Sequence, residues 1–375
     1  MKQKKTIVIS AVNILEAGPL TILKECLSYL SELAQLGQYR VVAIVYDESL
    51  ASYPGIEYIQ TKWPKKRWVN RLWYEYVSMY NISKQLGPIY LWFSLHDTSP
   101  RVKAERRVVY CHNTYLFYKW GIIDLVFAPK IAAFALFTRW IYRPNLHKNR
   151  FLVVQQGWFA DALARLYSFS KDSIVVAAPE SNLSHVNKGQ MPEKYPADGK
   201  YTFIFAASAN SHKNFQVICR AVEILEKRYS LDNFRVLLTL KGDENSYARW
   251  IYKSWRHLAC IDFLGFLPQD ELHRYYHVSN CLLFPSKIES WGLPISEFAS
   301  LGKPMLLADL PYARSTAQGS KSTAFFNPDD ALELAGMMKS LIDGDLSGLK
   351  TVPEDMVSSS SVKSWQELFD ILLTR

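Results

Sequence analysis

Residues 284–304 read Phe284-Pro-Ser-Lys-Ile-Glu-Ser-Trp-Gly-Leu-Pro-Ile-Ser-Glu-Phe-Ala-Ser-Leu-Gly-Lys-Pro304. The apolar run 281–284 predicts a strand that leads into this stretch, and a loop with Gly and Pro follows it. Pro294 suits the first turn of a helix, which the pattern predicts over 294–301. A second strand is expected at 304–307. Such a strand–helix–strand unit predicts a parallel sheet with helices on its faces.

The same alternation continues on both sides of this unit. The second half of the chain predicts further strands at 202–207, 234–240 and 260–263, and helices at 214–229, 245–256, 269–277 and 329–342. The first half predicts strands at 6–12, 40–46, 89–95, 107–111 and 151–155, and a helix at 19–36. The expected fold class is therefore α/β, with two doubly wound Rossmann-like domains.

The boundaries of these domains follow from length and composition. A chain of 375 residues is long enough for two domains. The stretch around 178–200 is rich in Pro, Asn, Ser, Gly and Lys and lacks apolar periodicity, which favours a linker. We expect a first domain over 1–180, a linker over 181–200, a second domain over 201–355 and an amphipathic terminal helix within 356–375.

Positive charge is concentrated in one part of the chain. The formal net charge is +9, yet residues 51–150 hold 16 Lys and Arg against 5 Asp and Glu, whereas the other residues hold 28 against 30. This asymmetry predicts an anionic partner for residues 51–150: a lipid surface, a lipid-phosphate acceptor or nucleic acid. Because no nucleic-acid-binding motif supports the last alternative, we do not expect a nucleic acid partner.

Cysteine usage and hydropathy bear on the cellular location. The five Cys are scattered and form no C-x-x-C pair, so no disulfide framework or zinc site is expected and a reducing cytoplasm is favoured. The N-terminus combines lysines with a short apolar run in the manner of a signal peptide, but a buried first strand explains that run better. No uninterrupted apolar run reaches the roughly 18 residues of a membrane span.

Two carboxylates in the opening stretch suggest a ligand. Glu289 falls in the predicted loop and Glu297 near the start of the predicted helix. The N-terminus of a helix carries partial positive charge and unpaired N–H groups, which suit phosphate. Carboxylates beside such a site can accept hydrogen bonds from ligand hydroxyls. A phosphorylated polyol, such as a nucleotide sugar, meets both requirements; solvated glutamates in an ordinary strand–loop–helix connection are the alternative.

The stretch from Glu289 to Pro304 resembles the E-x7-E signature of the retaining glycosyltransferases with the GT-B fold, in glycosyltransferase family four, the group 1 type. Those enzymes usually read E-G-F-G-L-P-x-x-E-A-x-A-x-G-x-P. The Gly-Leu-Pro between the two glutamates and the Gly-Lys-Pro after them make the match specific. The resemblance implies a GT-B fold, whose terminal helix crosses back to the first domain, and a nucleotide-sugar donor bound in the second domain.

The resemblance also implies roles for individual residues. Lys213, in the loop after the strand at 202–207, would neutralise the leaving diphosphate, but Ser208 stands where the family has an Arg. Glu289 would face the donor sugar, and Glu297 would bind the ribose hydroxyls. The remaining expected donor-binding residues are Gly18, Gly265, Phe266, Trp291, Gly292 and Leu293.

A histidine in the first half completes the expected catalytic set. His112 follows a predicted strand and resembles the family histidine near the sugar and acceptor, so Glu289, His112 and Lys213 are the expected catalytic residues. His96 and Asp97 lie in a similar setting. For both histidines a purely structural role remains the alternative. The single Asp-x-Asp, at Asp343, is interpreted as a solvated helix end, so no divalent metal and no other cofactor are expected.

The resemblance implies that the configuration at the donor's anomeric carbon is retained. We expect attack from the face of the leaving group, with charge stabilisation by Lys213, and we assign Glu289 to orientation and charge stabilisation rather than to covalent catalysis. Two other activities remain open. One is a nucleotide-sugar hydrolase or epimerase of the same fold, and the other is a non-catalytic nucleotide-sugar-binding subunit. The absence of a G-x-G-x-x-G or P-loop motif argues against dehydrogenases and P-loop enzymes.

The basic region predicts how the acceptor is reached. Residues 62–76 interleave cations with aromatic residues, a composition that binds the headgroup layer of anionic bilayers. The residues expected to contact the membrane or acceptor are Lys65, Lys66, Arg67, Trp68, Arg71 and Trp73. Similar enzymes dock in this way to reach a polyprenyl-diphosphate-linked acceptor. We therefore expect a cytoplasmic protein, peripheral on the inner face of the cytoplasmic membrane, that acts in bacterial surface polysaccharide synthesis.

Overall fold

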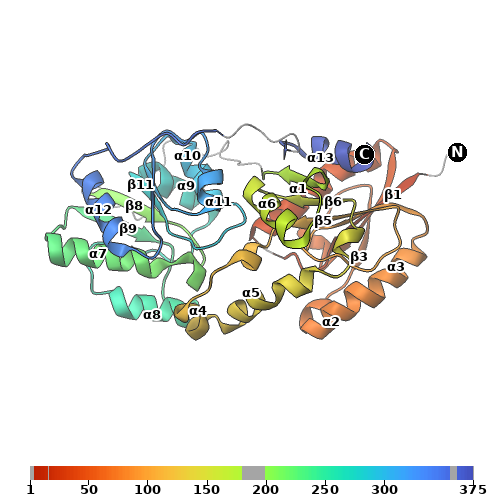
Figure 1. Cartoon of the computed structure of the whole chain (residues 1–375), viewed down its shortest axis with the longest axis horizontal. Coiled ribbons are helices and arrows are strands. Elements are labelled where there is room, and N and C mark those ends of the chain that lie inside the picture. The colour runs from red at the N-terminus through yellow and green to blue at the C-terminus, as the bar shows by residue number, and fades with distance from the viewer. Residues whose placement is uncertain (1–3, 16, 180–198, 355–360, 375) are drawn as a thin grey trace. The chain divides into compact units, whose positions relative to one another are not determined.

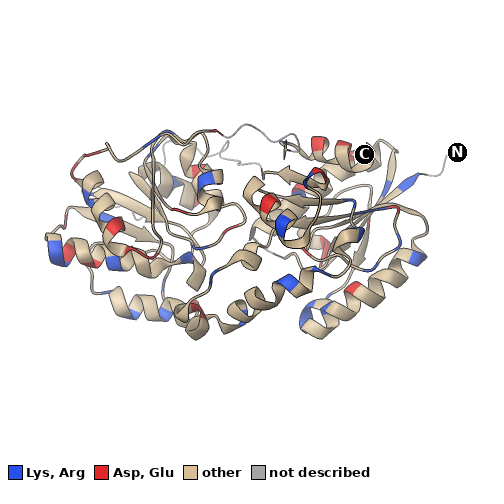
Figure 2. Ribbon diagram, in the orientation of Figure 1, with Lys and Arg blue, Asp and Glu red and all other residues tan. Residues whose placement is uncertain are grey.

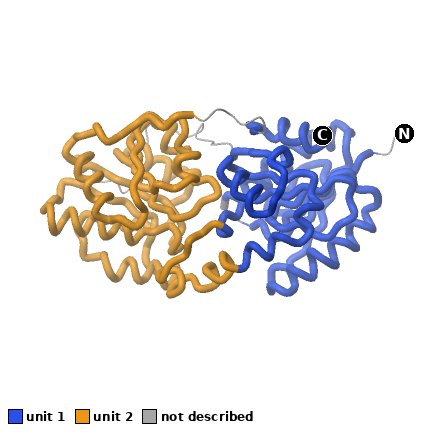
Figure 3. Tube along the Cα trace, in the orientation of Figure 1, with its two compact units in different colours: residues 1–116, 137–180, 357–375 blue, residues 117–136, 181–356 orange. Residues whose placement is uncertain are grey.

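The computed structural model describes residues 4–15, 17–179, 199–354 and 361–374 (Figure 1). The chain divides into two compact units (Figure 3). The first comprises residues 1–116, 137–180 and 357–375, and the second comprises residues 117–136 and 181–356. Each unit is built around one parallel sheet.

The first unit contains a sheet of eight strands in the order β14-β7-β6-β5-β4-β1-β2-β3. Its strands are β1 (Lys5–Ala11), β2 (Tyr39–Val45), β3 (Ile56–Gln60), β4 (Ile89–Ser94), β5 (Arg106–Cys111), β6 (Phe151–Val154), β7 (Ile174–Ala177) and β14 (Ser361–Val362). β2 and β3 extend to one side of β1, whereas β4 to β7 extend to the other. The strand order therefore reverses between β1 and β4, which is where a doubly wound sheet binds ligands.

The residues of β1 alternate between two apolar layers. Ile7 and Ile9 pack with Leu27 of α1 (Ala17–Gln35) and with α13 (Trp365–Thr374). Val8 lies on the opposite face and packs with Met79. Because successive side chains of a strand point to opposite faces, an almost wholly apolar strand is expected to be buried on both sides. β1 is central to the first unit for this reason.

The remaining helices of the first unit lie between its strands in the sequence. They are α2 (Trp68–Trp73), α3 (Met79–Gln85), the second half of α5 (Pro129–Tyr142) and α6 (Gly157–Tyr167). A π-helical turn, Tyr74–Ser78, joins α2 to α3. Among the described residues, no helix combines the length and the apolarity needed to cross a bilayer.

The second unit contains a sheet of six strands in the order β10-β9-β8-β11-β12-β13. Its strands are β8 (Tyr201–Phe205), β9 (Phe234–Leu238), β10 (Ile261–Phe263), β11 (Cys281–Phe284), β12 (Met305–Ala308) and β13 (Thr323–Phe326). In chain order this is the 3-2-1-4-5-6 arrangement of a Rossmann sheet. The strand order reverses between β8 and β11. The loops after these two neighbouring strands therefore start side by side and lead to opposite sides of the sheet.

Helices surround this second sheet in the intervals between its strands. They are α4 (Ile122–Phe127), the first half of α5, α7 (Phe215–Tyr229), α8 (Ser246–Trp255), α9 (Gln269–Val278), α10 (Leu293–Ala299), α11 (Pro311–Thr316) and α12 (Ala331–Ile342). α12 begins at Asp330, whose carboxylate accepts hydrogen bonds from the N–H groups of Leu332 and Glu333. Such side-chain capping satisfies donors that the first turn leaves unpaired.

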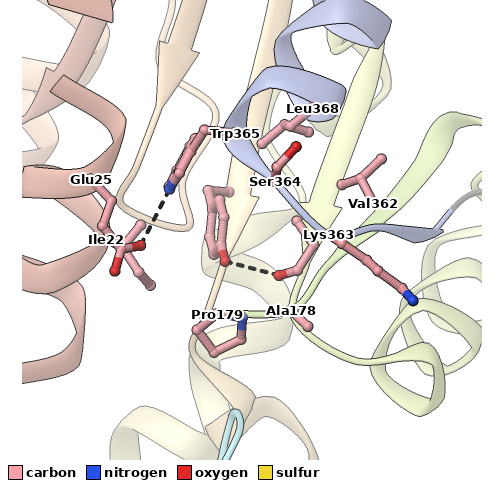
Figure 4. Close-up of a pocket in the computed structure, with 11 residues that line it drawn as sticks. Ile22, Glu25, Ala178, Pro179, Val362, Lys363, Ser364, Trp365 and Leu368 are labelled. Atoms are coloured by element: carbon pink, nitrogen blue, oxygen red, sulfur yellow. Dashed lines mark hydrogen bonds between the residues drawn. The ribbon is translucent and has the colours of Figure 1, made fainter. Parts of the chain in front are cut away.

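The C-terminal helix α13 packs on the first unit. The Phe369 ring is stacked on Tyr29 of α1 and meets Phe93 of β4 edge-on. The Trp365 indole donates a hydrogen bond to the Glu25 carboxylate over 3.2 Å (Figure 4). Arg106 donates to the carbonyl oxygen of Leu372 over 3.0 Å. Apolar burial and these polar contacts together join the end of the chain to its first 100 or so residues.

The structure corrects one expectation about the domains. Residues 117–136 were expected in the first domain, but they group with the second unit. The physical reason is aromatic packing, because the Phe127 ring stacks on Trp250 of α8 at 5.2 Å between centroids and meets Tyr247 edge-on. The expected linker at 181–200 lies outside the described residues, apart from its last two positions.

Candidate functional site

The loops after β8 and β11 bring a lysine and a glutamate together in the second unit. Lys213 ends a short helical turn, Ser211–Lys213, and its Nζ donates a hydrogen bond to Glu289 Oε1 over 2.6 Å. The side chain of Lys213 is 16% exposed and that of Glu289 is 14% exposed. Because the strand order reverses between β8 and β11, both residues lie at the position where Rossmann sheets bind ligands.

The turn that carries Lys213 is fixed from several sides. Asn214 adopts a left-handed backbone (φ 62°), and its amide donates to the carbonyl oxygens of Pro285 and Pro328 over 3.2 and 2.7 Å. The N–H of Lys287 donates to the carbonyl oxygen of His212 over 2.8 Å. Burial, reinforced by the Lys213 charge, lowers the pKa of His212 to about 3, so this imidazole is neutral at neutral pH. Lys213 is therefore the cation of this turn.

Ser208 occupies the position where the sequence comparison expects an Arg. Its side chain is exposed, and its hydroxyl accepts a hydrogen bond from the Asn210 amide over 2.9 Å. The lysine in the adjacent loop, Lys287, forms an ion pair with Asp329 at 2.5 Å. Within the described contacts, no second cation joins Lys213 and Glu289. The site therefore has one lysine, whereas the family resemblance implies a lysine and an arginine.

Gly292 directly precedes α10 and has a backbone conformation that favours glycine. Its φ is +89°, and an added Cβ would lie 3.3 Å from Ile295 Cδ1 and 3.5 Å from Phe284 Cε1. The neighbouring Trp291 indole donates to the Ser296 hydroxyl over 3.2 Å, which holds it against the first turn of α10. Leu293 is the first residue of α10. Backbone and side chain therefore fix the turn between Glu289 and Glu297.

Glu297 lies on α10, where burial raises the pKa of its carboxyl to about 7. Oε1 of this carboxyl is 3.8 Å from Nε2 of His273 on α9. Both ring nitrogens of His273 are buried without a hydrogen-bond partner in the described structure. A carboxyl that is buried beside an unsatisfied imidazole is suited to bind a ligand with hydroxyl groups, because hydroxyls can donate to one and accept from the other.

The predicted base-binding loop follows β10. Gly265 has a φ of +76° and is buried, whereas the ring of Phe266 is 87% exposed. An added Cβ at Gly265 would lie 3.4 Å from Lys241 Cβ. This loop follows the edge strand β10, two strands away from β8. Phe266 therefore offers an unoccupied aromatic face at the carboxyl edge of the sheet.

In the first unit, His112 lies directly after β5 and contacts Asp97. Asp97 has a left-handed backbone (φ 65°), and its Oδ1 accepts hydrogen bonds from the N–H groups of His112 and Asn113 over 2.7 and 2.8 Å. Its Oδ2 is 3.2 Å from Nε2 of His112. The carboxylate favours a proton on Nε2, which leaves Nδ1 as an acceptor. Nδ1 is buried and has no partner in the described structure.

His96 has a structural environment that distinguishes it from His112. Its Nε2 is 2.8 Å from the Ser10 hydroxyl, and its Nδ1 is 2.9 Å from the Thr98 hydroxyl. Burial lowers its pKa to about 4, although the nearby Glu75 charge acts in the opposite direction. A neutral imidazole with both nitrogens engaged is part of the core. His96 also lines a cavity together with Asp97 and His112, so its role remains a prediction.

A cavity of about 200 Å³ lies where the strand order of the first sheet reverses. His112, Asp97, Asn13 and Pro19 are among its lining residues. The Asn13 amide nitrogen is buried and has no partner in the described structure. The predicted donor-binding residue Gly18 lies next to Pro19, but an added Cβ there would meet no atom within 4 Å. The described contacts therefore give no steric reason for a glycine at that position.

The residues predicted to meet a membrane are mostly exposed, with one exception. Lys65 and Lys66 end a short helical turn, Arg67 precedes α2, and Trp68 and Trp73 are the end residues of α2. The exception is Arg71. Its Nε donates to Glu75 over 2.9 Å and its Nη2 donates to the carbonyl oxygen of His96 over 3.2 Å. Because Glu75 is fully buried, Arg71 balances a charge inside the unit rather than acting as a free surface cation.

Comparison with known proteins assigns the second half of the chain. Residues 187–354 match the family described as "Glycosyl transferases group 1". Residues 187–354 are therefore similar to a group 1 glycosyltransferase domain. This domain contains Lys213, Glu289 and Glu297, whose individual roles remain predictions.

A curated relative of this chain is "O-antigen chain mannosyltransferase B" of Escherichia coli. It is 20% identical over 204 residues, which cover 53% of this chain and 53% of the relative. The alignment thus spans about half the length of that relative.

Solved structures extend the fold comparison to the whole chain. A glycosyltransferase of Rickettsia africae has a TM-score of 0.61 at 15% identity, covering 99% of this chain and 93% of that one. The lipopolysaccharide outer core galactosyltransferase WaaB has a TM-score of 0.59 at 12% identity, covering 91% of each chain. HepE of Anabaena, solved with UDP and glucose, has a TM-score of 0.58 at 11% identity, covering 92% of each chain. At these identities the likeness shows the fold alone, and it confirms the expected GT-B class.

Proposed function

We propose that the chain is a retaining glycosyltransferase. It would transfer a hexose from a nucleotide-sugar donor to a glycan or lipid-linked glycan acceptor, in the synthesis of a bacterial surface polysaccharide. The observation that carries this proposal is the Lys213–Glu289 pair at the strand-order reversal of the second sheet, within a group 1 domain. The O-antigen mannosyltransferase relative supports the polysaccharide pathway.

The donor side follows from the second unit. Glu297 would accept hydrogen bonds from the ribose hydroxyls, and this contact favours the ionised form of a carboxyl whose burial otherwise favours protonation. Phe266 would stack on the base. Lys213 would exchange its contact with Glu289 for the donor diphosphate, which releases Glu289 to face the sugar. The ion pair is therefore interpreted as the resting state of the site.

The reaction is a substitution at the anomeric carbon. The bond from that carbon to the diphosphate oxygen breaks, and the acceptor hydroxyl attacks from the same face. The departing phosphate oxygen takes the acceptor proton, so no protein base is needed for that proton. Lys213 stabilises the charge that develops on the diphosphate, and Glu289 stabilises positive charge on the sugar ring. His112 would hydrogen-bond the sugar or the acceptor through Nδ1.

Lipid-linked acceptors would be reached at a membrane surface. Val69 and Trp73 of α2 are 72% and 60% exposed and lie beside Lys65, Lys66 and Arg67. Figure 2 marks the Lys and Arg positions along this part of the ribbon in blue. Ile122 and Val126 of α4, in the second unit, are 81% and 65% exposed. The combination of exposed apolar and cationic residues in 65–73 suits the headgroup layer of an anionic bilayer.

The membrane proposal is tested by flotation with liposomes that contain or lack anionic lipid. We expect binding only with anionic lipid, and weaker binding of a Trp68→Ser/Trp73→Ser variant. An exposed apolar residue far from α2 in sequence, changed as Leu346→Ser, serves as the control. Equal flotation with neutral and anionic liposomes contradicts the proposal.

The activity itself is tested by binding followed by turnover. Thermal shifts with UDP, GDP, ADP, dTDP and their sugars identify the donor. Release of the nucleoside diphosphate is then measured with and without lipid-linked glycan acceptors. Acceptor-dependent release supports transfer, whereas acceptor-independent release indicates a hydrolase, and binding without release indicates a non-catalytic subunit. Near wild-type transfer by Glu289→Gln would rule out the role given to Glu289.

A further inference from the structure

A segment from the first half of the sequence contacts the turn that carries Lys213. Asp124 of α4 is buried, and its Oδ1 accepts a hydrogen bond from the Ser211 hydroxyl over 2.6 Å. Its Oδ2 accepts from the N–H of Gly121 over 2.8 Å. Ser211 is buried too. The carboxylate therefore links the start of α4 to the first residue of the Lys213 turn.

A second contact joins the same two segments. The Tyr118 ring meets the His212 ring edge-on, with 6.2 Å between centroids. The two contacts therefore act on Ser211 and His212, the two residues that directly precede Lys213. The position of α4 does not depend on these contacts alone, because Phe127 stacks on Trp250. α4 thus has an apolar attachment to α8 and a separate polar attachment to the Lys213 turn.

The polar attachment is directional in a way that apolar packing is not. A buried carboxylate costs stability unless hydrogen bonds compensate it, and here two donors do so. Each oxygen of the Asp124 carboxylate accepts one of these two hydrogen bonds. A carboxylate bound by short hydrogen bonds restrains the Ser211 hydroxyl closely. Movement of Ser211 would also move Lys213, since the Lys213 N–H bonds to Asn210 and the Asn214 N–H bonds to Ser211.

We propose that Asp124 is a positioning residue for the donor site, acting through Ser211 on Lys213. The inference rests on the proposed function, because Lys213 is taken as the group that meets the donor diphosphate. It assigns residues 117–127 to the donor-binding machinery, although the sequence predicts that they belong to the first domain, 1–180. Asp124 itself does not touch the donor in this proposal.

The test measures binding of nucleoside diphosphates by calorimetry, with the one that wild type binds most tightly among UDP, GDP, ADP and dTDP. Asp124→Ala removes both hydrogen bonds, of which only the one from Ser211 reaches the Lys213 turn. We therefore expect the Kd to rise about tenfold, the effect of losing one charge-assisted hydrogen bond. Asp124→Asn keeps an acceptor for Gly121 and an amide that can donate to Ser211, so we expect a Kd within about twofold of wild type. Asp232→Asn, an exposed residue of the same unit, is the control.

Coupling separates a positioning role from a general structural one. We expect Asp124→Ala to raise the Kd further by less than about twofold in a Lys213→Gln background, because its effect passes through Lys213. An undiminished tenfold effect in that background overturns the proposal. If Asp124→Ala does not fold, Ser211→Ala replaces it, with Ser211→Thr as the variant that retains the hydroxyl.

The binding measurement tests the proposed function and the role of Asp124 separately. If wild type binds none of the nucleoside diphosphates, the proposed function fails. If wild type binds one of them and Asp124→Ala binds it equally well, the proposed function stands and the role of Asp124 is wrong.

Discussion

At the scale of single residues, the candidate site is defined by groups that lack their usual partners or have unusual ones. Glu297 is mostly buried and its nearest basic group is His273, His112 has an unsatisfied Nδ1, and Lys213 is held by Glu289. Unsatisfied buried groups cost stability, and they occur where a ligand completes the hydrogen bonding. Two predictions follow from this balance between stability and binding.

The first prediction concerns the pH dependence of stability at Glu297. Burial raises the pKa of this carboxyl from an ordinary 4.5 to about 7, so between those values the folded state holds more protons than the unfolded state. The free energy of unfolding therefore falls as pH rises from about 4.5 to about 7. Because Gln does not titrate, the Glu297→Gln variant lacks this pH-dependent change in the free energy of unfolding. Relative to wild type, we expect the variant to gain on the order of 2 to 3 kcal/mol between pH 4.5 and pH 8, measured by urea unfolding.

A matched control for this measurement is Glu333→Gln, an exposed glutamate of the same unit for which no such gain is expected. A difference between wild type and Glu297→Gln that does not change with pH contradicts the proposed burial of the carboxyl. Binding of a nucleoside diphosphate should also weaken in wild type below pH 7, because a protonated carboxyl accepts hydrogen bonds less well.

The second prediction concerns the pair formed by Lys213 and Glu289. Lys213→Gln leaves a mostly buried carboxylate without its cation, and we expect a loss of about 1 to 3 kcal/mol in the free energy of unfolding. The double variant Lys213→Gln/Glu289→Gln has no unpaired charge and should recover most of that loss. Chemical unfolding of the two single variants and the double variant gives the coupling. Additive losses would show that the pair does not form.

At the scale of elements, the geometry of the site depends on turns that connect strands to helices. The loop from β11 to α10 reverses direction at Gly292, with a φ of +89° and two side chains within 3.5 Å of a would-be Cβ. The turn after β8 depends on Asn214 in a left-handed conformation. Short polar residues and glycine are the residue types that adopt such backbones at low cost.

The third prediction tests this dependence with a pair of glycine substitutions. Gly292→Ala must adopt a positive φ and crowd Ile295, so we expect a loss of about 1 to 3 kcal/mol in stability and weaker nucleotide binding. Gly336→Ala lies in the middle of α12 with open space around it, so we expect a gain of up to about 1 kcal/mol. Thermal unfolding of both variants checks the contrast, and equal effects would exclude backbone strain at Gly292.

Several elements could not be predicted from sequence pattern. β3 has weakly alternating, half-exposed residues, β7 and β13 are four residues long, and α11 has six residues. Length alone does not explain these misses, because the equally short β11 and β12 were predicted from continuous apolar runs, whereas β3 and β13 include half-exposed positions. The longer buried strands β1, β4 and β8 were predicted to within two residues, because long apolar runs are a strong signal for strands of a parallel sheet.

At the scale of the whole molecule, contacts between residues far apart in sequence decide which segments belong together. α13 contributes Leu368, Phe369 and Leu372 to the core of the first unit, some 270 residues after β4. Residues 117–136 join the second unit in the same way. Both assignments depend on complementary surfaces rather than on any local pattern.

The fourth prediction tests the contribution of α13 to the first unit. Phe369 is fully buried against Tyr29 and Phe93, so we expect Phe369→Ala to destabilise the first unit by about 3 to 5 kcal/mol. The exposed Leu346, changed to Ala, should have an effect within about 0.5 kcal/mol. Hydrogen exchange resolved by segment measures the effect on each unit. Unchanged protection of β1 and β4 would show that α13 is not part of that core.

The amino-acid sequence alone determined the α/β class, the two doubly wound halves and the stretch from Glu289 to Pro304, because hydrophobic periodicity and turn residues are local properties. Tertiary structure alone decided that Lys213 pairs with Glu289, that Arg71 donates to the carbonyl oxygen of His96 and that Asp124 reaches the Lys213 turn. These partners are 25 to 87 positions apart, or are determined by burial. The chain's path in three dimensions sets such distances, and no local pattern encodes it.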